Sequence, residues 1–158
     1  MHPRAQEFAE RAADRYGLEP AIAEFPEGTK TAAAAAEAVG CETAQIASSL
    51  AFDVDGELVV VITSGANRVS EAALADHLGA DPSTVSMADP DRIADVLGWA
   101  IGGVPPICHE TPVPIFVDPT LLDLDTVWAA AGTPQSVFPI DPTELADLAG
   151  AEPADVVA

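Results

Sequence analysis

A loop rich in glycine and proline is the segment of this chain whose backbone is best suited to chemistry. It contains Gly102, Gly103 and Pro105, and His109 follows it. Glycine lets the backbone approach a ligand, so N–H groups here could donate to a carbonyl oxygen, or the glycines could simply turn the chain before the next strand. His109, whose usual pKa is about 6.5, could orient a water molecule or could be a surface histidine beside Glu110.

Two adjacent serines form a second candidate. Ser48 and Ser49 lie within an apolar run that is typical of a strand. Neighbouring residues in a strand point to opposite faces, so we expect only one of them to face a cleft, and we favour Ser48.

Further polar residues stand where strands are expected to end. Ser64, Gly65 and Asn67 close a strongly apolar segment, where they could hold a ligand or form an ordinary turn between a strand and a helix. Asp118 precedes Pro119, so it could hold the amino group of a substrate or could open a turn.

The two cysteines, Cys41 and Cys108, have neither the spacing of metal ligands nor that of a disulfide framework, and we expect reduced thiols and no metal. Cys108 precedes His109, but neighbours in a strand point apart, so a nucleophile and base pair is not favoured. Trp99 and Trp128 are expected in the core rather than as stacking platforms, because the chain has few aromatic residues.

Periodicity and end signals define the elements that must position these residues. Helices are expected over Pro3–Tyr16, Thr31–Gly40, Ser70–Gly79, Asp89–Gly98 and Pro142–Leu148. Strands are expected near Ala21–Phe25, over Gln45–Val54 and Glu57–Ser64 joined by the turn Asp55-Gly56, and at Thr84–Ala88, Pro114–Asp118, Val127–Gly132, Ser136–Ile140 and Ala154–Val157. This order predicts an α/β fold of the α+β type. The single domain, residues 1–158, should contain a mixed, largely antiparallel sheet or partial barrel with helices outside it.

Charge is the most unusual feature of the composition. The chain has 26 acidic residues against 6 basic ones, a formal net charge of −20, and Lys30 is its only lysine. The acidic residues are spread along the chain, which indicates a solvated surface suited to a high-salt cytoplasm rather than an acidic tail. So few cations argue against DNA or tRNA binding through phosphate contacts.

Several classes of protein are not indicated. No apolar run approaches the roughly 20 residues that span a bilayer, and the N-terminal residues lack the apolar stretch of a secretory signal. The glycine-rich fingerprints of dinucleotide and phosphate-loop sites are also missing. We therefore expect a cytoplasmic protein with no membrane partner and no nucleotide cofactor.

The motifs in order resemble one known family. They are Thr31 with its Ala-rich helix, QIASSLAF, VITSGANRVS, the Gly102-Gly103-Val104-Pro105-Pro106 loop with the strand to Asp118, WAAAG ending at Gly132, and FPIDPTELADL. From about Thr29 onward the chain resembles the YbaK family, the free-standing relatives of the editing domain associated with prolyl-tRNA synthetases.

The resemblance implies a trans-acting hydrolase of the ester between a wrong amino acid and a tRNA 3′ end, such as alanine or cysteine on tRNA for proline. In the family, backbone amides and the substrate's own groups position the attacking water or thiol, with no metal or organic cofactor. It implies a reaction centre at Ser48, Gly102, Gly103 and His109, substrate contacts at Ser64, Gly65, Asn67, Pro105, Asp118 and Gly132, and a tRNA 3′ end and a synthetase as partners.

Ser48 departs from the family pattern, because a lysine occupies this position in the relatives. Lys30 precedes the Ala-rich helix and cannot replace it. The alternative is therefore a non-catalytic module that binds an aminoacyl group, a nucleotide or a protein partner. The scarcity of cations also predicts weak binding of tRNA by the chain alone.

Overall fold

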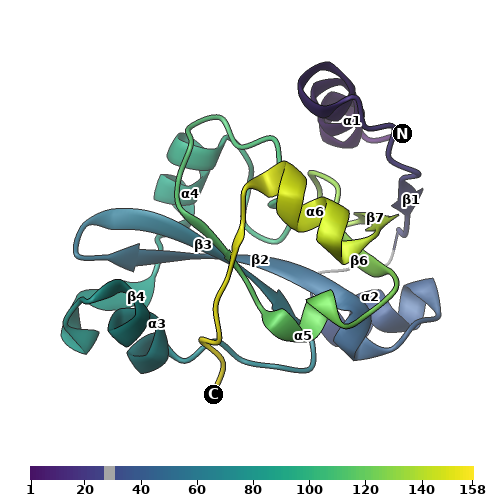
Figure 1. The fold of residues 1–158 in the computed structure, drawn as a ribbon. Coiled ribbons are helices and arrows are strands. Elements are labelled where there is room, and N and C mark those ends of the chain that lie inside the picture. Colours follow the sequence, from purple (N-terminus) through teal and green to yellow (C-terminus); the bar gives the residue numbers. More distant parts are fainter. Residues whose placement is uncertain (27–30) are drawn as a thin grey trace.

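The computed structural model describes residues 1–26 and 31–158, which form a sheet flanked by helices (Figure 1). Thr29, where the family resemblance begins, and Lys30 lie outside the described residues. The strands are β1 (Ala23–Glu24), β2 (Ile46–Val54), β3 (Glu57–Ser64), β4 (Val85–Met87), β5 (Ile115–Val117), β6 (Val127–Ala130), β7 (Ser136–Ile140) and β8 (Glu152–Pro153). The helices are α1 (Pro3–Tyr16), α2 (Ala32–Val39), α3 (Glu71–Leu78), α4 (Pro90–Leu97), α5 (Pro119–Leu122) and α6 (Pro142–Ala149), with short 3₁₀ turns at Thr43–Gln45 and Pro82–Thr84.

The helices begin and end at the residues that the sequence indicates. The Thr31 hydroxyl accepts a hydrogen bond from Ala34 N–H at 3.0 Å, and Ser70 caps α3 in the same way through Ala73 N–H. Glycines in the left-handed conformation end five helices, at Gly17, Gly40, Gly79, Gly98 and Gly150. Among the described residues, no helix has both the length and the apolar composition to cross a bilayer.

The strands form an open mixed sheet in the order β1-β7-β6-β2-β3-β5-β8, with β4 added to β2. Four of its seven pairings are antiparallel and three, those of β2 with β6, β3 with β5 and β5 with β8, are parallel. The predicted fold class is therefore confirmed, as an open sheet rather than a partial barrel.

Two details in the last third of the chain differ from the prediction. The last strand lies at Glu152–Pro153 and not at Ala154–Val157, because α6 ends at Gly150 and the chain pairs with β5 almost at once. The Asp118-Pro119 pair opens the short helix α5 rather than only a turn.

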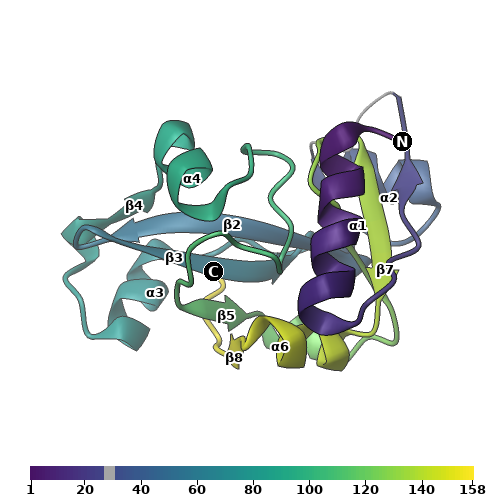
Figure 2. The same cartoon turned by 90° about the horizontal axis from the view of Figure 1, so that it is seen from above.

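Aromatic packing attaches α1 to the rest of the fold. The ring of Phe8 lies 5.0 Å from that of Phe138 on β7 and 6.2 Å from that of Trp99, and Figure 2 shows α1 running beside β7. Trp99 is 1% exposed and donates its ring N–H to the carbonyl of Cys108, so it belongs to the core as predicted. The guanidinium of Arg4 stacks 4.1 Å above the Trp99 ring.

Alternate residues of β2 face different packing layers. Ala47 and Ala51 belong to the main core, which includes Ile93 of α4, whereas Ile46 packs with Ala35 and neighbouring residues of α2. The helices α2 and α3 lie at opposite ends of the long β2–β3 hairpin (Figure 1). The two faces of β2 therefore pack against different elements, one against α2 and the other against the main core.

Few of the carboxylates have a cationic partner. Arg4 and Arg11 both pair with Glu7, and Arg92 pairs with Asp53. Because only 6 basic residues face 26 acidic ones, the surface carries about twenty uncompensated negative charges whatever the pairing.

We therefore expect the stability of the fold to rise with potassium chloride from millimolar to molar concentration. Molar salt shortens the Debye length to about 3 Å and weakens the repulsion, and a gain of about 2 kcal/mol would raise Tm by about 4–8 °C in a chain of this size. Thermal unfolding in a salt series tests this, with sorbitol at matched osmolality as the control. A Tm that is flat or falls with salt would contradict it.

Candidate functional site

The sheet is interrupted along one edge of β2. β3 pairs with β2 from Ala47 to Val54 and so occupies one whole edge. On the other edge, β6 pairs only with Ile46 and Ala47, and β4 pairs only from Phe52 to Val54. Among the described residues, no strand pairs with Ser48, Ser49 and Leu50 on this side.

A cleft of about 210 Å³ lies over this interruption. Every residue of β2 from Ile46 to Ala51 lines it, which is possible only if the cleft opens on the edge of the strand, since neighbours point to opposite faces. Its walls come from α2, α4, the loop after α4, and the strands β4, β6 and β7; the other lining residues are Thr31, Ala32, Ala35, Met87, Ile93, Ile101, Gly102, Val104, Trp128, Ala130 and Val137. Among the residues that the structure describes, none that lines the cleft is charged.

Both serines of β2 reach this cleft. The expectation that only one of them could do so is wrong, because the cleft opens on the strand edge and not on one face. Ser48 lies on the side of Ile46 and α2, and Ser49 on the side of Ala47 and Ala51. The Ser49 hydroxyl is buried without a hydrogen-bond partner, which costs about 1–3 kcal/mol unless something binds it.

The glycine loop contributes Gly102 to the cleft and uses Gly103 elsewhere. Gly102 is exposed, has a φ of 90° and lies on the cleft wall. Gly103 is buried against the turn between β6 and β7, where a Cβ would lie 2.7 Å from the Thr133 backbone. A side chain at Gly103 would therefore displace the loop, so loss of activity on its substitution would not report on substrate approach.

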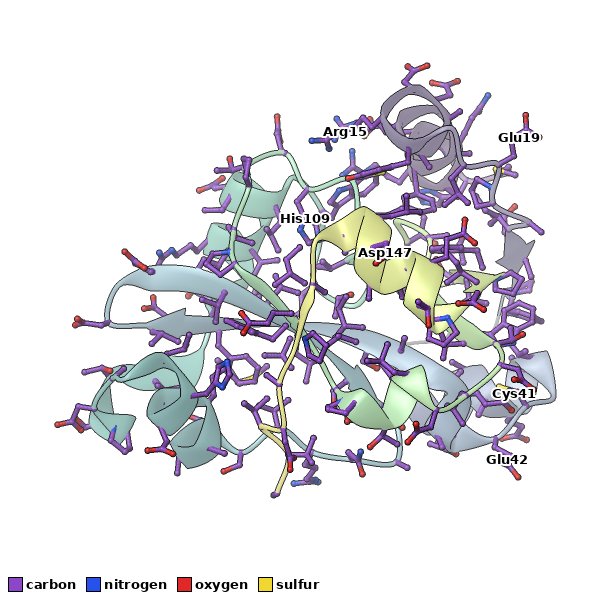
Figure 3. The ribbon with its side chains drawn as sticks, viewed as in Figure 1. Arg15, Glu19, Cys41, Glu42, His109 and Asp147 are labelled. Carbon is purple, nitrogen blue, oxygen red and sulfur yellow. The ribbon has the colours of Figure 1, made fainter. Side chains whose placement is uncertain are left out.

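Pro105, within the loop, and His109, which follows it, do not line the cleft. His109 is 6% exposed, so the alternative of a surface histidine is wrong. Its Nε2 lies 2.8 Å from the Pro105 carbonyl oxygen, which can only accept, so Nε2 carries the proton. Burial lowers the pKa of His109, and the Arg15 guanidinium lowers it further; Figure 3 shows both residues on the same side of the molecule. The Arg15 guanidinium also donates to the His109 carbonyl at 3.0 Å.

The cysteines are free and far from a reactive arrangement. Cys108 is fully buried, and burial raises the pKa of its thiol to about 11, so it stays protonated near neutral pH. Burial also raises the pKa of Cys41, which lies beside Glu42 at the α2 end of the molecule (Figure 3).

Asp118 joins three of the other predicted residues in a separate cluster at the end of β3. Its buried carboxylate accepts hydrogen bonds from Ser64 N–H at 3.2 Å, Asn67 Nδ2 at 2.8 Å and Thr120 N–H at 2.9 Å. Burial alone would raise the pKa of Asp118, but these bonds outweigh it and lower the pKa. The neighbouring Gly65 packs against the Thr43 carbonyl, where a Cβ would lie at 2.5 Å. None of these residues lines the cleft, and the cluster ties β3 to β5 and α5.

Gly132 also serves packing. It has a φ of 94°, and a Cβ there would lie 2.7 Å from the Trp99 ring. The structure thus brings Ser48 and Gly102 together at the cleft and places the other predicted residues around it.

Most of the residues that line the cleft were not among the predicted site residues. Trp128 was expected in the core but is half-buried and forms part of the wall. Met87 and Ile101 are each 52% exposed and line the cleft, and Ala130 also lines it. Only the unusual exposure of large apolar side chains distinguishes Met87 and Ile101, and exposure cannot be read from residue type. Within residues 1–26 and 31–158, no group of three or more His, Cys, Asp or Glu is placed to hold a metal ion.

Comparison with protein families matches residues 26–148 to the aminoacyl-tRNA editing domain. The chain belongs to this family. The resemblance inferred from the ordered motifs is therefore confirmed, and the editing domain includes the cleft, the glycine loop and the Asp118 cluster.

Relatives of the chain include free-standing proteins and parts of larger ones. The uncharacterized protein YwhH of Bacillus subtilis (strain 168) is 26% identical over 135 residues, which are 85% of this chain and 84% of YwhH. A proline–tRNA ligase of Leuconostoc citreum (strain KM20) is 27% identical over 80% of this chain but only 22% of the ligase. A crystal structure described as a "putative trans-editing enzyme for prolyl tRNA synthetase" has 36% identity and a TM-score of 0.92, covering 100% of this chain and 99% of that one.

We expect His109 to make stability depend on pH. The unfolded residue has a pKa of about 6.5 and the folded one a lower pKa, so the unfolded chain takes up the proton first and stability falls as the pH drops below about 6.5. His109→Gln retains a side-chain N–H donor for Pro105 and should lose less stability between pH 7 and pH 5. Urea unfolding in molar potassium chloride measures this, with the exposed His77→Gln as the control. Identical pH profiles for wild type and His109→Gln would contradict it.

Proposed function

We propose that this protein is a trans-editing deacylase that hydrolyses the ester of a mischarged tRNA, with alanine or cysteine on tRNA for proline as the substrates. The observation that carries the proposal is a small cleft, with no charge among its described lining residues, on the interrupted edge of β2 within a chain of the editing-domain family. Its volume of about 210 Å³ is below the roughly 300–1,000 Å³ of pockets for drug-sized ligands, which suits a small aminoacyl group.

The reaction needs little from side chains. A water oxygen adds to the ester carbonyl carbon, the bond from that carbon to the ribose oxygen breaks, and the ribose oxygen takes a proton, which yields free amino acid and a tRNA hydroxyl. An aminoacyl ester is already activated, so fixing the water and the ester in one geometry supplies several kcal/mol. Backbone N–H groups directed at the carbonyl oxygen stabilise the charge that develops on it.

The rim of the cleft suits the terminal adenosine. Met87, Ile101 and Trp128 offer apolar and aromatic surface along the cleft. The surrounding surface is strongly acidic and repels the tRNA phosphates, so contacts to the body of the tRNA would come from a synthetase partner. The same surface supports our proposal of a cytoplasm rich in potassium salts.

One observation favours a second function. Ser48 lies on the cleft wall at the position where the family resemblance implies a lysine, and no described residue of the lining supplies a cation that could hold the tRNA end. A cleft without this cation could bind an aminoacyl group, a nucleotide or a protein segment without hydrolysing an ester.

Hydrolysis of mischarged tRNA tests the first function against the second. We expect the protein to release amino acid from alanyl- or cysteinyl-tRNA for proline in molar potassium chloride, and to spare prolyl-tRNA. Release of radiolabelled amino acid, compared with buffer alone, measures this. No release above buffer from any of the three would support the binding module.

Restoring the missing cation should increase the rate. The ammonium group of Ser48→Lys would enter the cleft on the α2 side and bring three donors toward a phosphate or ester oxygen. We expect a rate about tenfold higher at moderate salt, which corresponds to about 1.4 kcal/mol of added transition-state stabilisation.

The matched control is Ser86→Lys, which adds the same charge at an exposed residue of β4 that does not line the cleft. Equal effects of the two variants would mean that net charge and not the position matters. A folded Ser48→Lys with an unchanged rate would remove Ser48 from the account of the site.

A further inference from the structure

Two backbone hydrogen bonds show which residues of β2 direct their N–H and C=O groups toward β3 and which direct them toward the opposite edge. Gly65 N–H donates to the Ile46 carbonyl at 2.8 Å, and residues of an antiparallel pair alternate between bonded and non-bonded positions. Ile46, Ser48 and Leu50 therefore direct their backbone groups toward β3. The Ala88 N–H donates to the Ala51 carbonyl at 3.0 Å on the opposite edge, which agrees with this alternation because Ala51 is then directed away from β3.

Ser49 consequently directs both its N–H and its C=O away from β3. Ala47 and Ala51 have the same orientation, but β6 pairs with Ala47 and the chain after β4 bonds to the Ala51 carbonyl. Ser49 lies between them, where no strand of the described chain pairs with it. Its N–H and C=O face the cleft.

The Ser49 side chain provides a second, independent sign of a ligand. Its hydroxyl is the only buried side-chain nitrogen or oxygen in residues 1–26 and 31–158 without a hydrogen-bond partner. Buried polar groups in folded proteins are almost always paired. The Ser49 hydroxyl is thus unpaired in the same residue whose backbone has no strand partner on the cleft edge.

The part of the cleft lining that the structure describes contains no carboxylate to receive a substrate ammonium group. The described polar side chains of the lining are those of Thr31, Ser48 and Ser49, and Asp118, which does not line the cleft, is occupied by other donors. A carbonyl oxygen is therefore the natural acceptor for an α-amino group in this cleft.

We propose that Ser49 binds the aminoacyl group as a single-residue β-bridge. The α-amino group donates to the Ser49 carbonyl oxygen, and the ester carbonyl oxygen accepts from Ser49 N–H. The Ser49 hydroxyl makes a third hydrogen bond to the aminoacyl group. An aminoacyl group carries the same donor and acceptor as a residue in a strand, so a free strand edge recognises it as it would a peptide. This deepens the proposed deacylase function and rests on it.

The arrangement accounts for a cleft without the family lysine. Ser49 N–H points at the carbonyl oxygen that becomes negative during hydrolysis, which is the role of an oxyanion donor. The bridge leaves the amino acid side chain on the Ser49 side of β2, within the small cleft and against apolar residues such as Ile93 and Val104. Small side chains are therefore preferred.

Amide hydrogen exchange measured by NMR tests the bridge. The probe is 3′-(L-alanylamino)-3′-deoxyadenosine, in which a stable amide replaces the ester. In the free protein the Ser49 amide should exchange faster than those of Ser48 and Leu50, which bond to β3. Saturating probe should slow Ser49 exchange at least tenfold and leave the other two unchanged.

Two matched changes test the individual bonds. The des-amino probe, 3′-(propanoylamino)-3′-deoxyadenosine, should bind about tenfold more weakly, because the Ser49 carbonyl loses its donor. Ser49→Ala should weaken binding of the alanyl probe about threefold to tenfold while Tm stays equal or rises, because an unpaired buried hydroxyl is removed. Ser86→Ala, at an exposed residue of β4 that does not line the cleft, is the control and should change neither binding nor Tm.

The outcomes separate this proposal from the proposed function. Deacylation of alanyl- or cysteinyl-tRNA without protection of the Ser49 amide, or equal binding of the two probes, would overturn the bridge and leave the deacylase standing. Failure of the protein both to hydrolyse these esters and to bind the alanyl probe would overturn the function and the bridge with it.

Discussion

The unpaired middle of one edge of β2 is the constraint on which the site depends. Backbone N–H and C=O groups that are buried must find partners. β3 satisfies one edge of β2 completely, while β6 and β4 satisfy the two ends of the other edge and leave Ser49 between them. Water can satisfy such groups in the free protein, and a ligand with a matching donor and acceptor can replace it.

The surrounding elements hold this gap open and give it walls. The loop after α4 is held against the turn between β6 and β7, because Gly103 has no side chain to keep it from the Thr133 backbone. The Asp118 carboxylate fixes the end of β3 by accepting the Ser64 and Asn67 donors. Most of the residues that looked suited to chemistry therefore position the cleft instead of lining it.

Local signals predicted the fold well and the cleft only in part. Caps such as Thr31, the Asp55-Gly56 turn and the glycines after the helices determine element ends within a few residues, so the elements follow from the sequence. The roles of His109 and Asp118 depend on burial and on partners distant in sequence, which no local pattern records. The gap beside Ser49 arises because two strands stop short of each other on one edge, a property of pairing across the sheet.

A crystal structure of the protein with 3′-(L-alanylamino)-3′-deoxyadenosine tests the central claim most directly. The account predicts the alanyl group in the gap between β4 and β6, with its amino nitrogen within hydrogen-bonding distance of the Ser49 carbonyl oxygen and its carbonyl oxygen within that distance of Ser49 N–H. An alanyl group bound elsewhere, or bound in the cleft without contact to the Ser49 backbone, would contradict it.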